Sequence, residues 1–327
     1  MTYTKISGIS AYAPEDKITN DDLSKMVDTN DEWITTRVGI KERRILKGEN
    51  RGSSYMGIKA VEQLLSDLNV KPEEIDLLIC ATSNPDYRFP STASVIIHQM
   101  KMTKAYGYDI QAACAGFIVA LQEGNAYIKS GLYKKVVVVA AEKMTSMTDY
   151  QDRATCPLFG DAAGAALLEP TDEPIGIMDA ELHVDGVGLP HLLMKAGGSV
   201  LPASHDTVEA RYHYVYQEGR AVYKHAVTDM VESSASVMAR NGLNADNIDW
   251  FIPHQANMRI IEAVGSRLGL SEDKVLVNIE RYGNTSAASI PVCLNEYKHK
   301  LKKGDKVILT AFGAGFTWGA MYIVWGA

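Results

Sequence analysis

The sequence lacks any apolar run long enough to span a bilayer as a helix, so we expect no membrane contact. Its N-terminus has neither the basic start nor the apolar stretch of a secretory signal peptide. Cysteine is scarce, and the few present form neither a CxxC pair nor a metal-ligand spacing, so no metal site is expected. They are Cys80, Cys114, Cys156 and Cys293. Unpaired thiols without a signal peptide predict a cytoplasmic protein.

The sequence also lacks an excess of basic residues. Its 33 Lys and Arg residues are outnumbered by 40 Asp and Glu residues, giving a formal net charge of −7. This balance argues against nucleic acid as a partner, and it would repel an acidic protein unless a local basic patch intervened. A length of 327 residues with 46% hydrophobic composition is typical of a globular chain of two domains or one doubled domain.

What the sequence does contain is an internal repeat. Ile75 and Ile248 each precede a predicted strand. The interval between these two residues nearly equals the interval between the predicted strands that begin at Lys135 and Lys306. The β-branched runs are continuous rather than alternating, which is typical of strands that helices cover on both faces. A layered α/β architecture is therefore predicted.

A third match, at almost the same interval, sets Cys114 opposite Asn284. Cys114 follows a strand predicted at 107–111, and Asn284 follows one predicted at 275–279. Three nearly equal offsets indicate duplication of an α/β unit. The turn formers and charges of residues 170–174 mark the boundary, so we expect halves at 1–172 and 173–327, and we interpret residues 184–216 as an irregular insertion.

Cys114, His254 and Asn284 each come directly after a predicted strand. Ligands of α/β sheets bind at the carboxyl ends of strands, so these side chains are expected at one end of the molecule. Cys114 also starts an apolar helix, whose dipole lowers a thiol pKa. The small residues of loop 311–319 can bring backbone N–H groups close to a ligand oxygen. Each feature alone has a structural alternative. Cys114 could be a buried thiol, His254 a core histidine, Asn284 a helix cap and the loop a tight turn.

Four segments together resemble β-ketoacyl-[acyl-carrier-protein] synthase III, in order and in spacing along the whole chain. They are Ala113–Phe117, His254–Asn257, Tyr282–Ala288 and Phe312–Gly319. The resemblance implies a duplicated thiolase-like fold, layered α-β-α-β-α with two mixed sheets. The half at 1–172 would carry the nucleophilic cysteine, and the half at 173–327 would carry the histidine and the asparagine.

The resemblance also implies a reaction. Cys114 would take an acyl group, with acetyl expected, from acyl-CoA, and the backbone N–H groups of Cys114 and Ala314 would stabilise the oxyanion. Malonyl-acyl carrier protein would then lose CO₂ while His254 and Asn284 donate hydrogen bonds to its thioester oxygen. A β-ketoacyl-carrier protein would result, with no metal and no cofactor beyond the acyl-CoA substrate. Ala314 stands where known members have a glycine.

CoA contacts follow from the same resemblance. Trp33 and Arg37 would hold the adenine together with Arg153, since an indole face and planar guanidinium groups suit a purine that bears phosphates. Arg220 replaces an asparagine near the pantetheine arm. Carrier-protein docking is expected at Lys224 and at the run Gln255, Ala256, Asn257, Met258 and Arg259. Further positive charge lies nearby in sequence at Lys41, Arg43 and Arg44. Phe89 would close the acyl pocket of a neighbouring subunit, which implies a homodimer.

Other functions fit the sequence less well. A thiolase needs a second cysteine near the final strand, and loop 312–319 has none. A non-catalytic partner subunit typically lacks the nucleophile, and a simple CoA-binding module has no need of Cys114. A relative in polyketide or other secondary metabolism that uses an unusual acyl-CoA starter stays open, as does the identity of the starter.

Overall fold

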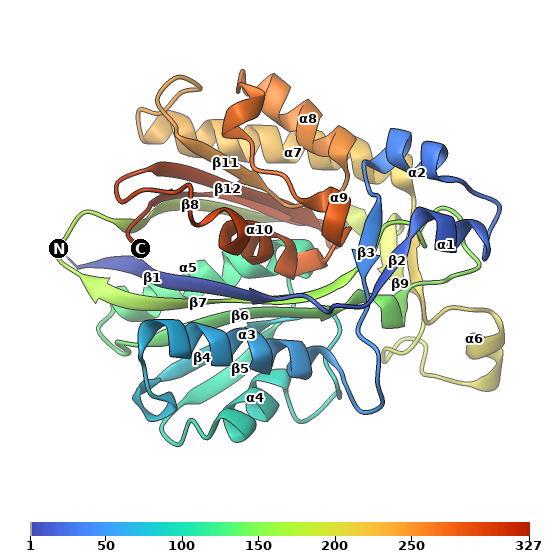
Figure 1. Cartoon of the computed structure of the whole chain (residues 1–327), viewed down its shortest axis with the longest axis horizontal. Coiled ribbons are helices and arrows are strands. Elements are labelled where there is room, and N and C mark those ends of the chain that lie inside the picture. The colour runs from blue at the N-terminus through green and yellow to red at the C-terminus, as the bar shows by residue number, and fades with distance from the viewer. Residues whose placement is uncertain (1) are drawn as a thin grey trace.

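A computed structural model describes residues 2–327 and shows two β-sheets stacked face to face between layers of helices (Figure 1). The first sheet has the strand order β1-β7-β6-β4-β5. Its strands are β1 (Tyr3–Tyr12), β7 (Asp161–Thr171), β6 (Val136–Lys143), β4 (Leu77–Ala81) and β5 (Tyr106–Ile110). The second sheet has the order β11-β12-β13-β8. Its strands are β11 (Trp250–Pro253), β12 (Lys306–Gly313), β13 (Thr317–Val324) and β8 (Gly176–Val184).

The two sheets repeat one topology. In the first, β5, β4 and β6 run parallel, whereas β7 and β1 pair antiparallel with their neighbours. In the second, β11 and β12 are parallel, and β13 and β8 are again antiparallel. The chain passes from one sheet to the other in residues 172–175. The mixed sheets confirm the predicted fold class.

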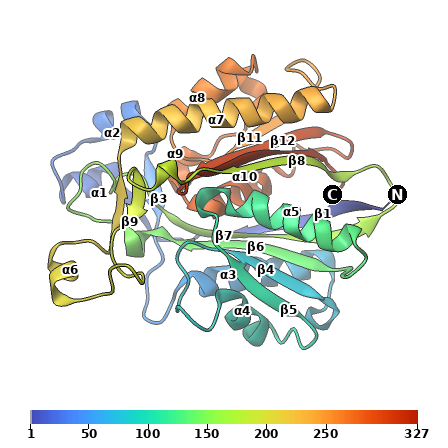
Figure 2. The ribbon, with the colours of Figure 1, turned by 180° about the vertical axis from the view of Figure 1, so that it is seen from behind.

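Helices form three layers around the sheets (Figure 2). The middle layer is α5 (Gly116–Lys129) with α10 (Ser289–Tyr297). The outer layers are α3 (Ser53–Leu68) with α4 (Thr92–Met100) on the first sheet, and α7 (Gly219–Arg240) with α8 (Met258–Arg267) on the second. Each sheet is therefore covered on both faces, which gives the order α-β-α-β-α.

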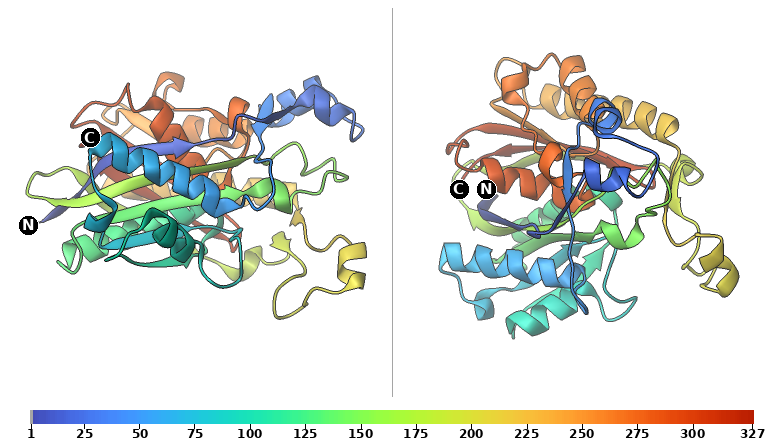
Figure 3. Two further views of the ribbon diagram at one scale, coloured as in Figure 1. Left: turned by 60° about the horizontal axis from the view of Figure 1, so that its bottom comes forward. Right: turned by 45° about the vertical axis from the view of Figure 1, so that its right-hand side comes forward.

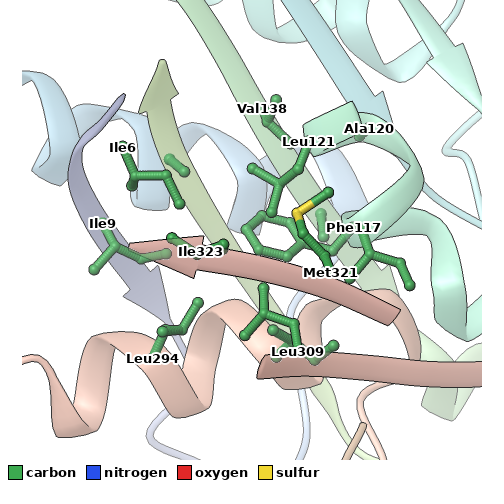
Figure 4. Packing of buried hydrophobic residues seen from close by; sticks show 14 of the residues in the cluster. Ile6, Ile9, Phe117, Ala120, Leu121, Val138, Leu294, Leu309, Met321 and Ile323 are labelled. Atoms are coloured by element: carbon green, nitrogen blue, oxygen red, sulfur yellow. The ribbon is translucent and has the colours of Figure 1, made fainter. Parts of the chain in front are cut away.

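The central core lies in the middle layer. Phe117 and Leu121 of α5 are completely buried and pack in one cluster with Leu309, Met321 and Ile323 of the second sheet (Figure 4). Residues 136–141 are buried without interruption, because one face of β6 meets this core and the other meets α3. The continuous apolar runs of the sequence thus arise, as inferred, from strands that helices cover on both faces.

Short elements gather at one end of the molecule, at the right of Figure 1, and Figure 3 shows the loop that carries α6 projecting from the body there. They are α1 (Asn20–Ser24), α2 (Asp31–Val38), β2 (Lys17–Thr19), β3 (Glu42–Arg44), β9 (Leu192–Met194), α6 (His205–Glu209), β10 (Val215–Gln217) and α9 (Ile279–Tyr282). The predicted insertion at 184–216 therefore contains regular elements. No helix in the described part of the chain is both long and apolar enough to cross a membrane.

Two details of the predicted repeat are wrong. The strand predicted at 275–279 is a single bridge between Val275 and Phe251, because a 3₁₀ turn ends at Lys274 and α9 begins at Ile279. The turn that precedes α5, η2 (Ala113–Ala115), matches η6 (Ser286–Ala288) before α10. These turns shift the register of the repeat from the predicted one, so Cys114 lies opposite Ala287 and not opposite Asn284.

Candidate active site

Cys114 lies in the sharp turn between β5 and α5. Ala113, just before it, has a φ of 45°, a left-handed conformation that a residue with a side chain adopts only under strain. The thiol is free and borders a large cavity. Burial raises the pKa of the Cys114 thiol to about 12, against a smaller lowering by the Ser286 hydroxyl. The expected depression of this pKa by the helix dipole is thus outweighed in the free enzyme.

The loop between β12 and β13 closes against this turn. A Cβ atom added to Gly313 would lie only 2.5 Å from the backbone nitrogen of Cys114, so a glycine is required for this approach. Ala314 follows it and also borders the cavity. Neither the Cys114 N–H nor the Ala314 N–H enters a turn or loop hydrogen bond within residues 2–327. Both residues border the cavity, where their N–H groups can bind a ligand oxygen.

His254 follows β11 and is 1% exposed. The Ser289 Oγ atom accepts a hydrogen bond from the backbone N–H of Gln255 at 3.2 Å, and it lies 2.6 Å from His254 Nδ1. We assign the Ser289 hydroxyl as the donor in this pair, and that tautomer places the ring proton on Nε2. Burial lowers the pKa of His254 to about 3, so the imidazole stays neutral and donates from Nε2.

Asn284 is 7% exposed and is held by groups from both halves of the chain. Its backbone N–H donates to the Leu158 carbonyl at 2.8 Å, and its Oδ1 accepts the Ser286 N–H at 2.9 Å. Because Oδ1 is occupied, the side chain presents its Nδ2 donors. The three predicted catalytic residues border one cavity of about 1380 Å³, although they come from different halves.

The predicted CoA residues lie at the same cavity. The Arg37 and Arg153 guanidinium carbons lie 4.6 and 4.4 Å from the centre of the Trp33 ring. Arg153 also approaches Asp28, at 3.7 Å. The two guanidinium groups thus stack on the indole. Arg220 borders the cavity as well.

The predicted docking residues do not all reach the surface. Lys224 and Arg259 are exposed, and the Arg259 guanidinium lies over the Tyr223 ring. Ala256 and Asn257 border the cavity, whereas Met258 is half-buried against other apolar side chains.

Two of these expectations are wrong because the side chains are buried. Gln255 is 1% exposed, and its amide bonds the Pro253 carbonyl and the Asn278 N–H. Its role is therefore to hold the loop before α8. Arg43 is fully buried and donates to the carbonyls of Ile18 and Pro157, so it adds no charge to the surface.

Phe89 is 86% exposed and does not border the cavity of its own chain. Sequence reasoning missed Ser286 and Ser289, which bond Asn284 and His254, and it missed Glu142, which accepts from Ser286. The one signal for Glu142 is its place at the end of an otherwise uninterrupted apolar strand. Among residues 2–327, no group of three His, Cys, Asp or Glu side chains is placed to hold a metal.

A duplicated fold whose first half supplies a cysteine, and whose second half supplies a histidine and an asparagine, defines a thiolase-fold condensing enzyme. Family models for 3-oxoacyl-[acyl-carrier-protein] synthase III match residues 108–186, and models for its C-terminal part match residues 238–325. The chain belongs to this family.

Individual relatives agree over nearly the whole chain. The beta-ketoacyl-[acyl-carrier-protein] synthase III of Porphyromonas gingivalis is 59% identical over 98% of this chain and 96% of its own length. The crystal structure of 3-oxoacyl-[acyl-carrier-protein] synthase III from Aquifex aeolicus has a TM-score of 0.90 at 43% identity, covering 98% of this chain and 100% of that one. A priming beta-ketosynthase of a polyketide biosynthetic pathway has a TM-score of 0.91 at 33% identity, covering 99% and 96%.

The state of His254 gives a prediction that needs no substrate. Because burial lowers the pKa of this imidazole to about 3, its ¹⁵N signals should show the Nε2–H form and stay unchanged between about pH 5 and 8. The His254→Gln variant assigns the signals. A titration midpoint in the ordinary histidine range would contradict the effect of burial, and a proton on Nδ1 would contradict the assigned donor in the contact with Ser289.

Proposed function

We propose that this enzyme condenses an acyl-CoA starter, acetyl-CoA in the simplest case, with malonyl-acyl carrier protein. The products are CO₂, CoA and a β-ketoacyl-carrier protein, and no cofactor beyond the substrates takes part. The observation that carries the proposal is one cavity in which a free thiol meets two sets of unused donors. One set is the N–H groups of Cys114 and Ala314, and the other is His254 and Asn284.

In the first half-reaction the Cys114 sulfur attacks the acyl-CoA carbonyl carbon and displaces CoA. The N–H groups of Cys114 and Ala314 face the turn where negative charge develops on the oxygen. Preorganised hydrogen-bond donors at such a charge lower the barrier more in a buried site than they would in water. The methyl group of Ala314 leaves its N–H in place.

In the second half-reaction the malonyl thioester loses CO₂, and an enolate forms whose oxygen carries the charge. His254 Nε2 and Asn284 Nδ2 are the two side-chain donors for this oxygen. Both are fixed by second partners, Ser289 and Ser286, so little reorganisation is needed. The enolate carbon then attacks the acyl-cysteine and releases Cys114.

The likeness to a priming ketosynthase of polyketide synthesis supports a second candidate, a role in secondary metabolism with an unusual starter. A large cavity admits more than an acetyl group. Acylation rates across a series of acyl-CoA lengths and branches separate the two, since a preference for acetyl-CoA favours the first and a strong preference for a rare starter favours the second.

The nucleophile is tested by replacing Cys114 with alanine. Production of acetoacetyl-carrier protein from acetyl-CoA and malonyl-carrier protein should fall by at least about 10³-fold, because no covalent intermediate forms. Cys293→Ala serves as the control, since Cys293 is buried in α10 and should leave condensation intact. A Cys114→Ala enzyme that condenses at the wild-type rate would disprove the acyl-cysteine route.

Substituting two arginines, one at a time, tests the proposed contacts with each substrate separately. Arg153→Ala should raise the KM for acetyl-CoA about 10-fold, through loss of a charged contact, and leave the KM for malonyl-carrier protein unchanged. Arg259→Ala should do the reverse and weaken the salt dependence of the carrier protein's KM. Each variant is the control for the other. Equal effects on both substrates would contradict the assignment.

We also propose a homodimer. Large apolar side chains are exposed at Phe89, at Val184 in the last position of β8, and at the loop residues Leu189 and Val200, and such surfaces are typical of interfaces. The mass in solution, measured by light scattering, should be twice 35.8 kDa. Phe89→Asp should shift it toward the single-chain mass, and a wild-type monomer would overturn the proposal.

A further inference from the structure

Glu142, the next-to-last residue of β6, is a buried carboxyl group behind the nucleophile. It is 0% exposed, and both of its oxygens accept the Ser83 N–H at 3.1 Å. Its Oε1 also accepts the Ser286 hydroxyl at 3.0 Å, and Thr82 Oγ1 lies 3.4 Å from Oε2. All of these partners are neutral. A charge held only by dipoles in a buried site is costly, so the group is balanced between its two protonation states.

Ser286 connects this carboxyl group to the site. Its hydroxyl donates to Glu142, and Ser286 borders the same cavity as Cys114, where the turn η6 packs on the turn η2. Its φ of 50° is strained for a residue with a side chain, and its N–H is fixed by Asn284 Oδ1. A hydroxyl in such a constrained position is typical of a functional site rather than of an ordinary helix start.

We propose that the Ser286 hydroxyl and the Glu142 carboxylate form a relay that removes the proton of the Cys114 thiol as it attacks acyl-CoA. This inference rests on the acylation step proposed above. The Cys114 S–H bond breaks and its proton passes to the Ser286 oxygen, while the Ser286 proton passes to Glu142. A bond forms between the Cys114 sulfur and the acyl carbon, and the bond from that carbon to the CoA sulfur breaks. The same path returns the proton to the CoA thiolate, so Glu142 and Ser286 end unchanged.

The other candidate base is poorly suited to this task. In the tautomer assigned above, His254 carries its proton on Nε2 and its Nδ1 accepts from Ser289, so neither nitrogen is open to take the thiol proton. Burial lowers the pKa of His254 to about 3, and it raises the pKa of Glu142 to about 7. A base with a pKa near the working pH accepts a proton far more effectively. The Cys114 thiol, with its pKa near 12, needs such a base.

The expected pH dependence of acylation is assigned to the Glu142 carboxyl group and not to the titratable groups around it. The nearby titratable groups on η2 and β4 are the thiols of Cys114 and Cys80. Burial is the main cause that raises the pKa of both thiols, and the Glu142 charge adds to it. On β7, Asp161 is occupied by Thr145 and Leu46. The neighbouring Lys143 donates its ammonium group to the Arg51 carbonyl and so points away.

The relay is tested by single-turnover acylation, followed as the mass of the intact protein after mixing with acetyl-CoA alone. Glu142 must be ionised to accept a proton, so the wild-type rate should rise with pH through a midpoint near 7. Glu142→Gln should remove this rise and slow acylation at pH 8 by about 10²-fold. Ser286→Ala should have the same two effects, because it cuts the path and leaves the carboxyl group in place.

Asp161→Asn is the matched control, since Asp161 is also a buried carboxyl group but does not contact Cys114 or Ser286. It should keep the pH-dependent rise. A purely structural role for Glu142 would lower the rate equally at every pH. The relay is overturned if Glu142→Gln and Ser286→Ala both retain the rise, and if Glu142→Gln does not fold, Ser286→Ala decides alone. A wild-type enzyme that takes no acetyl group would instead refute the proposed function.

Discussion

The close packing of the start of α5 and its preceding turn η2 against the turn η6 that precedes α10 is the constraint on which the rest of the structure depends. A Cβ atom at Gly116 would lie 3.3 Å from the Cβ of Ala287 and 3.0 Å from that of Ala81, so these segments leave no spare space. The contact brings together the turns that precede the two helices. Cys114 and Ser286, far apart in sequence, become neighbours because the two halves pack back to back.

The same packing buries the titratable groups of the site and thereby sets their charges. Burial raises the pKa of the Cys114 thiol and of the Glu142 carboxyl group, and it lowers that of the His254 imidazole. Every group is thus pushed toward its neutral form. Negative charge that develops on a substrate oxygen meets fixed N–H donors without competing cations, and the acidic surface of the chain plays no part in that step.

Much of this arrangement could be predicted from the sequence, because its signals are local. Continuous apolar runs such as 136–141 predict strands covered on both faces, and the ends of such strands placed Cys114 and His254 at one edge. The exact register of the repeat was missed, since nothing in the local sequence marks Ala113 and Ser286 as left-handed.

Other features depend on contacts between distant segments, and no local pattern reveals them. Gln255 lies within a motif that also contains exposed residues, yet its amide is used inside the fold. Glu142 takes its partners from two separate loops, through Ser83 and Ser286. Its importance is apparent only once the two halves are packed together.

The two sets of donors serve different half-reactions, and the acylated enzyme tests this division most directly. In a crystal structure of the acetylated protein, the acetyl group should be attached to Cys114 Sγ, with its carbonyl oxygen bound by the N–H groups of Cys114 and Ala314. His254 Nε2 and Asn284 Nδ2 should then remain free. An acetyl oxygen held by His254 and Asn284, or an acetyl group on another residue, would contradict the account.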